Sequence, residues 1–102
     1  MKISNNIKKD IQKKISTFNT KNNCEYHARY RGGFLYLDLQ DGHAKPSPIC
    51  RLTFTGNMEK WDFAIYKYSD NKYDPDEWIF PGSECIDGTL EGAMQAGLEA
   101  YG

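Results

Sequence analysis

The side chains of this chain best suited to acid–base chemistry are a histidine and two carboxylates. His27 and Asp38 become cross-strand neighbours if the chain reverses at Gly32-Gly33, and Asp62 falls on the same side of the predicted sheet. A carboxylate beside an imidazole raises the imidazole pKa and orients its ring, which suits general acid–base catalysis. The same pair is equally typical of a solvated contact that stabilises a hairpin weakly. The sequence contains no nucleophile elbow and no phosphate-binding glycine loop to strengthen the catalytic interpretation.

The spacing of the metal-ligating residues argues against a metal site. Cys24 and His27 are three positions apart in a predicted strand, so their side chains point to opposite faces and cannot close on one ion. The acids Asp74, Asp76 and Glu77 lack the spacing and the glycine of a calcium loop. We therefore expect no metal and no cofactor. Three cysteines without a pairing pattern indicate free thiols in a reducing compartment.

The most suggestive chemistry is a group of arginines among aromatic rings. Arginine and tyrosine are enriched where proteins bind each other, each arginine as a planar multiple donor and each ring as an apolar anchor. Strand alternation predicts that these side chains gather on one face of a sheet. The candidate partner-binding residues are Arg29, Arg31, Phe34, Tyr36, Arg51 and Tyr66.

Two predicted hairpins place these residues. In residues 24–31 apolar and polar side chains alternate, and Gly32-Gly33 is typical of a tight turn because glycine tolerates positive φ. Pairing across this turn puts Tyr26, Ala28 and Tyr30 on the same face as Leu35, Leu37 and Leu39. The two halves of the hairpin therefore agree on which face is the core.

A second hairpin is predicted from residues 49–55 and 60–68, joined by residues 56–59. It pairs Phe54 with Trp61, Leu52 with Phe63 and Cys50 with Ile65, and its reverse side carries Arg51 and Tyr66. Residues 41–48 are predicted to be a loop, because two prolines two positions apart do not fit a paired ladder. Residues 77–80 lie between prolines and are predicted to form either an edge strand or an extended flap. The alternative to an open arginine and aromatic face is that residues 73–81 fold across it.

Helices are predicted at both ends. In residues 4–19, Ile7, Ile11, Ile15 and Phe18 recur with helical spacing behind Ser4, a good N-cap. Residues 89–101 carry a second apolar stripe behind Asp87 or Thr89 as cap. The predicted fold is α+β: an N-terminal helix, a four- or five-stranded antiparallel meander and a C-terminal helix, with both helices on one face. We expect residues 1–102 to be one domain.

Composition and charge exclude several classes of protein. The chain has 102 residues, of which 39% are hydrophobic and 14% aromatic, so a disordered chain is not expected. It lacks the roughly 20 consecutive apolar residues of a membrane span and an N-terminal apolar signal core, so we expect a cytoplasmic protein without membrane contact. The net charge of −1 is unevenly distributed: residues 1–23 carry six Lys and one Asp, whereas residues 69–102 carry one Lys and eight acids.

From Cys24 onward the chain resembles a family of short prokaryotic proteins of unknown function. The shared runs are Pro48–Leu52, Trp61–Ser69, Tyr73–Trp78, Phe80–Gly82 and Asp87–Met94. Because this family has no characterised activity, the resemblance assigns no residue a role.

Three functional hypotheses follow. The first is a non-catalytic interaction domain that uses an open arginine and aromatic sheet face to bind a protein partner or a second copy of itself. The second is a domain that binds single-stranded nucleic acid with the same face and Lys8, Lys9, Lys13 and Lys14. The third is a small enzyme that uses His27 and Asp38 under a concave pocket.

Overall fold

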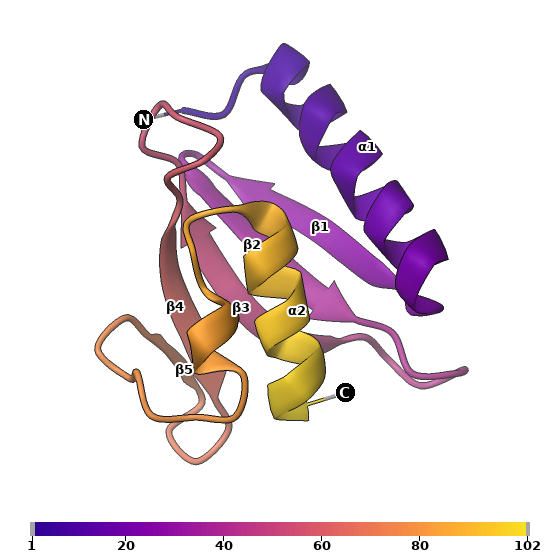
Figure 1. Ribbon diagram of the computed structural model, residues 1–102, viewed down its shortest axis with the longest axis vertical. Helices are drawn as coiled ribbons and strands as arrows, with labels where there is room; N and C mark the ends of the chain where they lie inside the picture. The colour runs from indigo at the N-terminus through magenta and orange to yellow at the C-terminus, as the bar shows by residue number, and fades with distance from the viewer. Residues whose placement is uncertain (1, 102) are drawn as a thin grey trace.

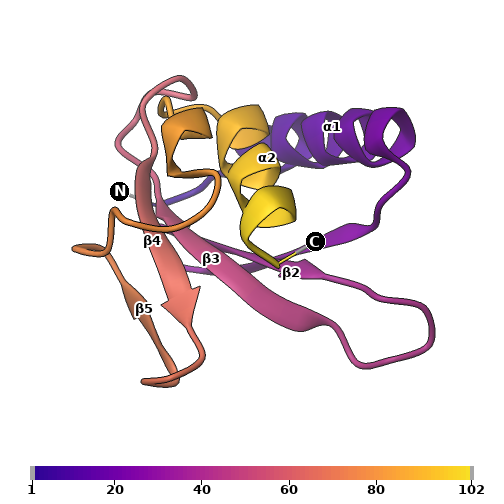
Figure 2. The same cartoon turned by 60° about the horizontal axis from the view of Figure 1, so that its bottom comes forward.

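The computed structural model describes residues 2–101, which form an antiparallel sheet with one helix before it and one after it (Figure 1). The elements are α1 (Asn5–Asn22), β1 (Tyr26–Arg31), β2 (Phe34–Leu39), β3 (Ser47–Thr53), β4 (Asp62–Lys67), β5 (Lys72–Asp74), a 3-10 turn η1 (Ser83–Cys85) and α2 (Leu90–Tyr101). The five strands lie in chain order, and both helices cover the same face of the sheet (Figure 2). The predicted α+β meander is therefore confirmed.

Helix α1 begins where the sequence predicts and ends one turn later. The Ser4 side chain accepts a hydrogen bond from the Ile7 backbone N–H at 3.3 Å, which makes it the N-cap. At the other end Asn23 adopts a left-handed conformation with φ of 52°. The Asn19 side chain accepts from the Tyr26 N–H at 2.9 Å and donates to the Tyr26 carbonyl at 3.2 Å. The asparagines therefore end the helix and connect it to β1 by hydrogen bonds.

The first hairpin has the predicted register. Tyr30 lies opposite Leu35, Ala28 opposite Leu37 and Tyr26 opposite Leu39, with Gly32 in the turn at φ of 59°. Leu35 and Leu37 are fully buried under the helices. The alternate residues of both strands consequently face away from the helices.

Strand β3 begins earlier than expected, at Ser47. The prediction that residues 41–48 form a loop is therefore wrong for residues 47 and 48. Pro48 lies opposite Asp38, and the register shifts between Leu37 and Asp38. This irregularity accommodates a proline that has no N–H to give to a ladder. The extra residue, Ile49, is buried together with Cys50.

The second hairpin pairs Cys50 with Ile65 and Leu52 with Phe63, as predicted. The edge strand lies elsewhere than at residues 77–80, because β5 pairs with the end of β4 through a turn containing Asn71 at φ of 52°. Pro75 then ends the pairing. Residues 77–80 contain no strand, and Phe80 instead stacks on the ring of Phe63 with centroids 6.0 Å apart.

Helix α2 packs closely on the middle of the sheet through small residues. The Thr89 hydroxyl accepts from the Gly92 N–H at 3.0 Å and caps the helix. Gly97 lies against Tyr26 and Ile49 so closely that a Cβ there would be 2.6 Å from Ile49 Cγ2. The buried Tyr26 hydroxyl donates to the Met94 carbonyl at 2.7 Å. Tyr26 therefore links β1 to α2 across the core.

Candidate functional site

The helices cover one face of the sheet and leave the other uncovered (Figure 2). The uncovered face, here called the outer face, carries the predicted site residues in two cross-strand rows. The first row runs from β1 to β4 as Arg31, Phe34, Thr53 and Asp62. The second row runs in the same order as Arg29, Tyr36, Arg51 and Ala64. Tyr66 lies next to the second row on β4 and pairs with Tyr73 of β5. The structure thus brings all six predicted residues onto one face.

Arg29 is held by an acid on the neighbouring strand. Its Nε donates to Asp38 Oδ2 at 2.5 Å and its Nη2 to Asp38 Oδ1 at 3.1 Å. The side chain of Asp38 is only 10% exposed, whereas that of Arg29 is 55% exposed. The hydrogen bond to Asp38 raises the pKa of Arg29, which keeps the guanidinium charged. This pair is electrically neutral as a unit.

Tyr73 covers part of the outer face from the edge strand, and sequence reasoning did not include it in the site. Its ring meets that of Tyr36 at 5.3 Å and that of Tyr66 at 4.9 Å between centroids. Its hydroxyl accepts from Arg29 Nη2 at 3.3 Å. Ala64 is 3% exposed although it faces away from the helices. Strand β5 has only three residues, so it carries no period-two pattern from which the position of Tyr73 could be predicted.

Arg51 lies between two rings. Its guanidinium carbon is 4.8 Å from the centroid of Phe34 and 5.7 Å from that of Tyr73. Its buried Nε has no hydrogen-bond acceptor among residues 2–101. The stacked rings fix the orientation of the guanidinium without neutralising its charge.

Two further charged residues of the outer face, Arg31 and Asp62, are exposed and form no ion pair with any residue that the structure describes. They stand at opposite ends of the first row, separated by Phe34 and Thr53. Arg31 and Arg51 therefore flank the half-buried ring of Phe34 as cations that have no carboxylate partner within residues 2–101. The outer face can accept an anionic group there and an apolar group on the rings.

The predicted acid–base pair does not form. His27 and Asp38 are opposite each other in the backbone register, but His27 Nε2 lies 2.9 Å from Glu25 Oε2 and Asp38 is bound by Arg29. A pocket of about 550 Å³ lies on the helix side, where Cys24, Leu39, Ile49, Leu98 and Tyr101 are among its lining residues. That pocket is away from His27 and Asp38 and brings no acid–base pair together.

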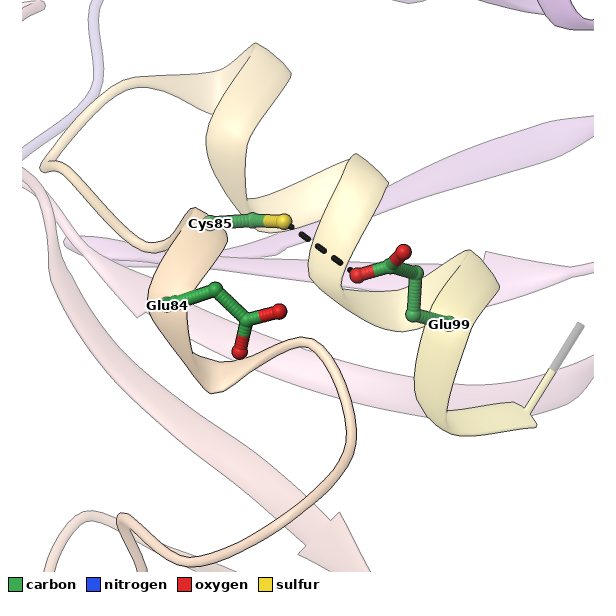
Figure 3. Close-up of side chains that lie close together, drawn as sticks. All are labelled: Glu84, Cys85 and Glu99. Carbon is green, nitrogen blue, oxygen red and sulfur yellow. Dashed lines mark hydrogen bonds between the residues drawn. The ribbon is translucent and has the colours of Figure 1, made fainter.

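The cysteines and histidines considered as metal ligands stay apart. Cys50 is fully buried in the core, Cys24 donates to Asn19 Oδ1 at 3.6 Å, and His43 lies in an exposed loop. A different group of three possible ligands, Glu84, Cys85 and Glu99, has donor atoms within 4.8 Å of one another between η1 and α2 (Figure 3).

The Glu84, Cys85 and Glu99 group is explained by contacts within the chain. Desolvation and the neighbouring carboxylates raise the pKa of Cys85, so its thiol keeps the proton that it donates to Glu99 at 3.4 Å. Both glutamates are exposed. The sequence did not predict this juxtaposition, because it depends on how η1 docks on α2 through Gly82.

Comparisons with protein-family models, with curated proteins and with solved structures give no match to this chain. Neither helix in residues 2–101 combines the length and the apolar character needed to cross a bilayer.

The two most exposed large apolar side chains within residues 2–101 do not belong to a strand. Ile79 is 91% exposed and Trp78 is 52% exposed, both in the segment after β5. Trp78 shares the wall of a pocket of about 530 Å³ with Thr53, Asp62 and Pro75. The first row of the outer face therefore ends, at Asp62, in a recess with an exposed indole.

Proposed function

We propose that the chain is a protein-interaction domain whose outer face binds a protein surface that presents carboxylates beside apolar or aromatic side chains. The observation that carries this proposal is the charge around Phe34, where Arg31 and Arg51 lack a carboxylate partner among residues 2–101. A guanidinium already held against aromatic rings loses little freedom on binding, which favours a planar acidic group. Arg29, Tyr36 and Tyr66 form the adjoining platform.

The area of the outer face indicates weak binding. Four strands about 4.8 Å apart and about 20 Å long present roughly 400 Å² in projection. A standard interface buries about 800 Å² on each partner. Contacts of this size are typical of transient associations.

Binding of single-stranded nucleic acid is the alternative, and the position of the lysines supports it less well. Lys8 Nζ lies 4.9 Å over the ring of Tyr30, on the side of the sheet that the helices cover. The other lysines of this hypothesis belong to the same helix, α1. Basic residues on the helix side do not extend the outer face into one groove, as a strand of nucleic acid requires.

A peptide-binding measurement tests the proposal. The probe is a labelled extended peptide in which glutamate and tyrosine alternate, followed by fluorescence anisotropy at low and physiological salt. We expect wild type to bind it and Arg31→Ala to weaken binding by about tenfold, which corresponds to one charge-assisted hydrogen bond. Lys45→Ala is the matched control, because Lys45 is an exposed cation in the loop before β3.

Two results would contradict the proposal. One is equal weakening by Arg31→Ala and Lys45→Ala, which would indicate general attraction of charge without a site. The other is that the glutamate peptide does not bind, whereas an oligothymidylate binds with an affinity that falls steeply as the salt concentration rises. That result would favour the nucleic-acid alternative.

A further inference from the structure

We infer that the partner of the outer face is a second copy of this chain, docked about a two-fold axis that runs parallel to the strands between β2 and β3. This inference rests on the proposed function and names its partner. The specific contact is Arg31 of each copy with Asp62 of the other.

The charges of the outer face are self-complementary along its first row. Arg31 lies opposite Phe34, Phe34 opposite Thr53 and Thr53 opposite Asp62, at the end of the β2–β3 ladder away from its register shift at Leu37 and Asp38. The cation and the anion at the two ends are the exposed charges of this row, and neither is paired within residues 2–101. The other charges on this face include two pairs within the chain, Arg29 with Asp38 and His27 with Glu25.

A two-fold axis along the strands exchanges the two ends of that row. In a symmetric interface each contact occurs twice, so residue i meets residue j and j meets i. With the axis above the gap between β2 and β3, Arg31 of one copy faces Asp62 of the other, and Phe34 faces Thr53. The second row is covered by the ring of Tyr73, which lies 5.3 Å from the ring of Tyr36 and 5.7 Å from the guanidinium carbon of Arg51. The direct contacts between the two copies are therefore those of the first row. Sheets packed face to face keep their strands within about 30° of each other, which this axis allows.

The surroundings of Asp62 suit a guanidinium. Asp62 shares a pocket of about 530 Å³ with Trp78 and Pro75, and the indole of Trp78 is half exposed. A carboxylate beside an aromatic face offers a charge-assisted hydrogen bond and a cation–π contact to the same arginine. Arg31 of the same chain does not reach it, since three strand spacings of about 4.8 Å put the two backbones about 14 Å apart.

Charge reversal tests the pairing. Wild type should show a reversible monomer–dimer equilibrium by sedimentation at up to millimolar concentration. Arg31→Glu and Asp62→Arg should each lower the association constant by at least about tenfold, since each creates two like-charge contacts. Lys45→Glu is the matched control and should leave the equilibrium unchanged, because Lys45 lies outside the outer face.

A mixture of the two single variants gives the decisive result. In a mixed dimer the carboxylate introduced by R31E faces the guanidinium introduced by D62R, and the native Asp62 of one copy faces the native Arg31 of the other. We therefore expect R31E and D62R to associate with each other though neither associates with itself, and the double variant R31E/D62R to regain self-association. Amide spectra of each variant check that the fold is retained.

The outcomes separate this inference from the proposed function. A wild type that stays monomeric at millimolar concentration overturns the second-copy partner, while binding of the glutamate peptide would still support the proposed function. A dimer that R31E does not weaken, or single variants that fail to associate when mixed, also overturns the inferred pairing. If wild type neither self-associates nor binds the peptide, both the proposed function and the second-copy partner are overturned.

Discussion

Arg29 on β1 and Asp38 on β2 form a bidentate ion pair, with Nε–Oδ2 at 2.5 Å and Nη2–Oδ1 at 3.1 Å. The acid is nearly buried and the arginine is half exposed. Loss of the arginine leaves a nearly buried carboxylate without the two hydrogen bonds that Arg29 donates to it.

We expect Arg29→Ala to lower the free energy of unfolding by about 1–3 kcal/mol, the cost of leaving a buried acceptor without its donors. Urea denaturation measures it. Arg31→Ala serves as control and should change the stability by less than about 0.5 kcal/mol, because Arg31 is exposed. Equal stability of Arg29→Ala and wild type would show that the pair contributes nothing.

The ring of Tyr73 holds the edge strand against the outer face. Tyr73→Ala removes ring contacts to Tyr36 and Tyr66, so we expect the free energy of unfolding to fall by about 1–3 kcal/mol and amide exchange in β5 to become faster. Tyr73→Phe keeps the ring and loses only the 3.3 Å hydrogen bond from Arg29, so it should stay within about 1 kcal/mol of wild type. If both variants are equally unstable, the hydroxyl and not the ring supplies the stability.

Close packing at Gly97 predicts the response of α2 to a single methyl group. A Cβ there meets Tyr26 and Ile49, so Gly97→Ala should destabilise by about 1–3 kcal/mol despite the better helix propensity of alanine. Thermal denaturation of Gly97→Ala, Tyr26→Phe and the double variant forms a cycle. Because removal of the Tyr26 hydroxyl relieves part of the clash, the double variant should be less unstable than the sum of the single changes. Strict additivity would contradict this packing.

The cap of α2 predicts a stability that depends on pH in the acid range. The Thr89 hydroxyl and backbone N–H donate to Asp87 Oδ1 at 2.6 and 3.0 Å, and these bonds lower the pKa of Asp87. A carboxylate whose pKa is lowered by folding stabilises the fold above its unfolded pKa and loses that contribution as the pH falls through the folded value. Carboxyl NMR titration should find the Asp87 pKa below the usual aspartate range in wild type and closer to it in Thr89→Val. An unchanged pKa in Thr89→Val would exclude the hydroxyl as the cause.

The outer face could be predicted from the sequence because alternation within each strand and the residues of each turn determine which side chains lie on it. Alternation in residues 24–31 and the turn at Gly32 determine the register of the first hairpin, and Cys50 opposite Ile65 follows from the apolar pattern of the second. Each of these positions follows from period-two patterning and turn chemistry alone.

The parts that were missed depend on side-chain contacts that leave no repeating pattern in the sequence. The edge strand forms at residues 72–74, where Tyr73 pairs with Tyr66 and Lys67 Nζ lies 3.7 Å from Asp74 Oδ2. A strand this short contains no periodic pattern from which these two contacts could be predicted. Pro48 enters β3 because a register shift opposite Asp38 tolerates it. The pairing of Asp38 with Arg29 in place of His27 reflects the better geometry of a guanidinium for a carboxylate.

The central claim, that the outer face is where this chain meets a partner, is tested most directly by NMR. The amide and arginine Nε resonances of wild type are followed as the glutamate and tyrosine peptide is added. We expect shifts in residues 29–36 and 51–53 and at the Nε groups of Arg31 and Arg51, with α1 unaffected. Shifts that instead follow α1 or α2, with the arginine Nε resonances unmoved, would place the binding surface on the helix side and contradict the claim.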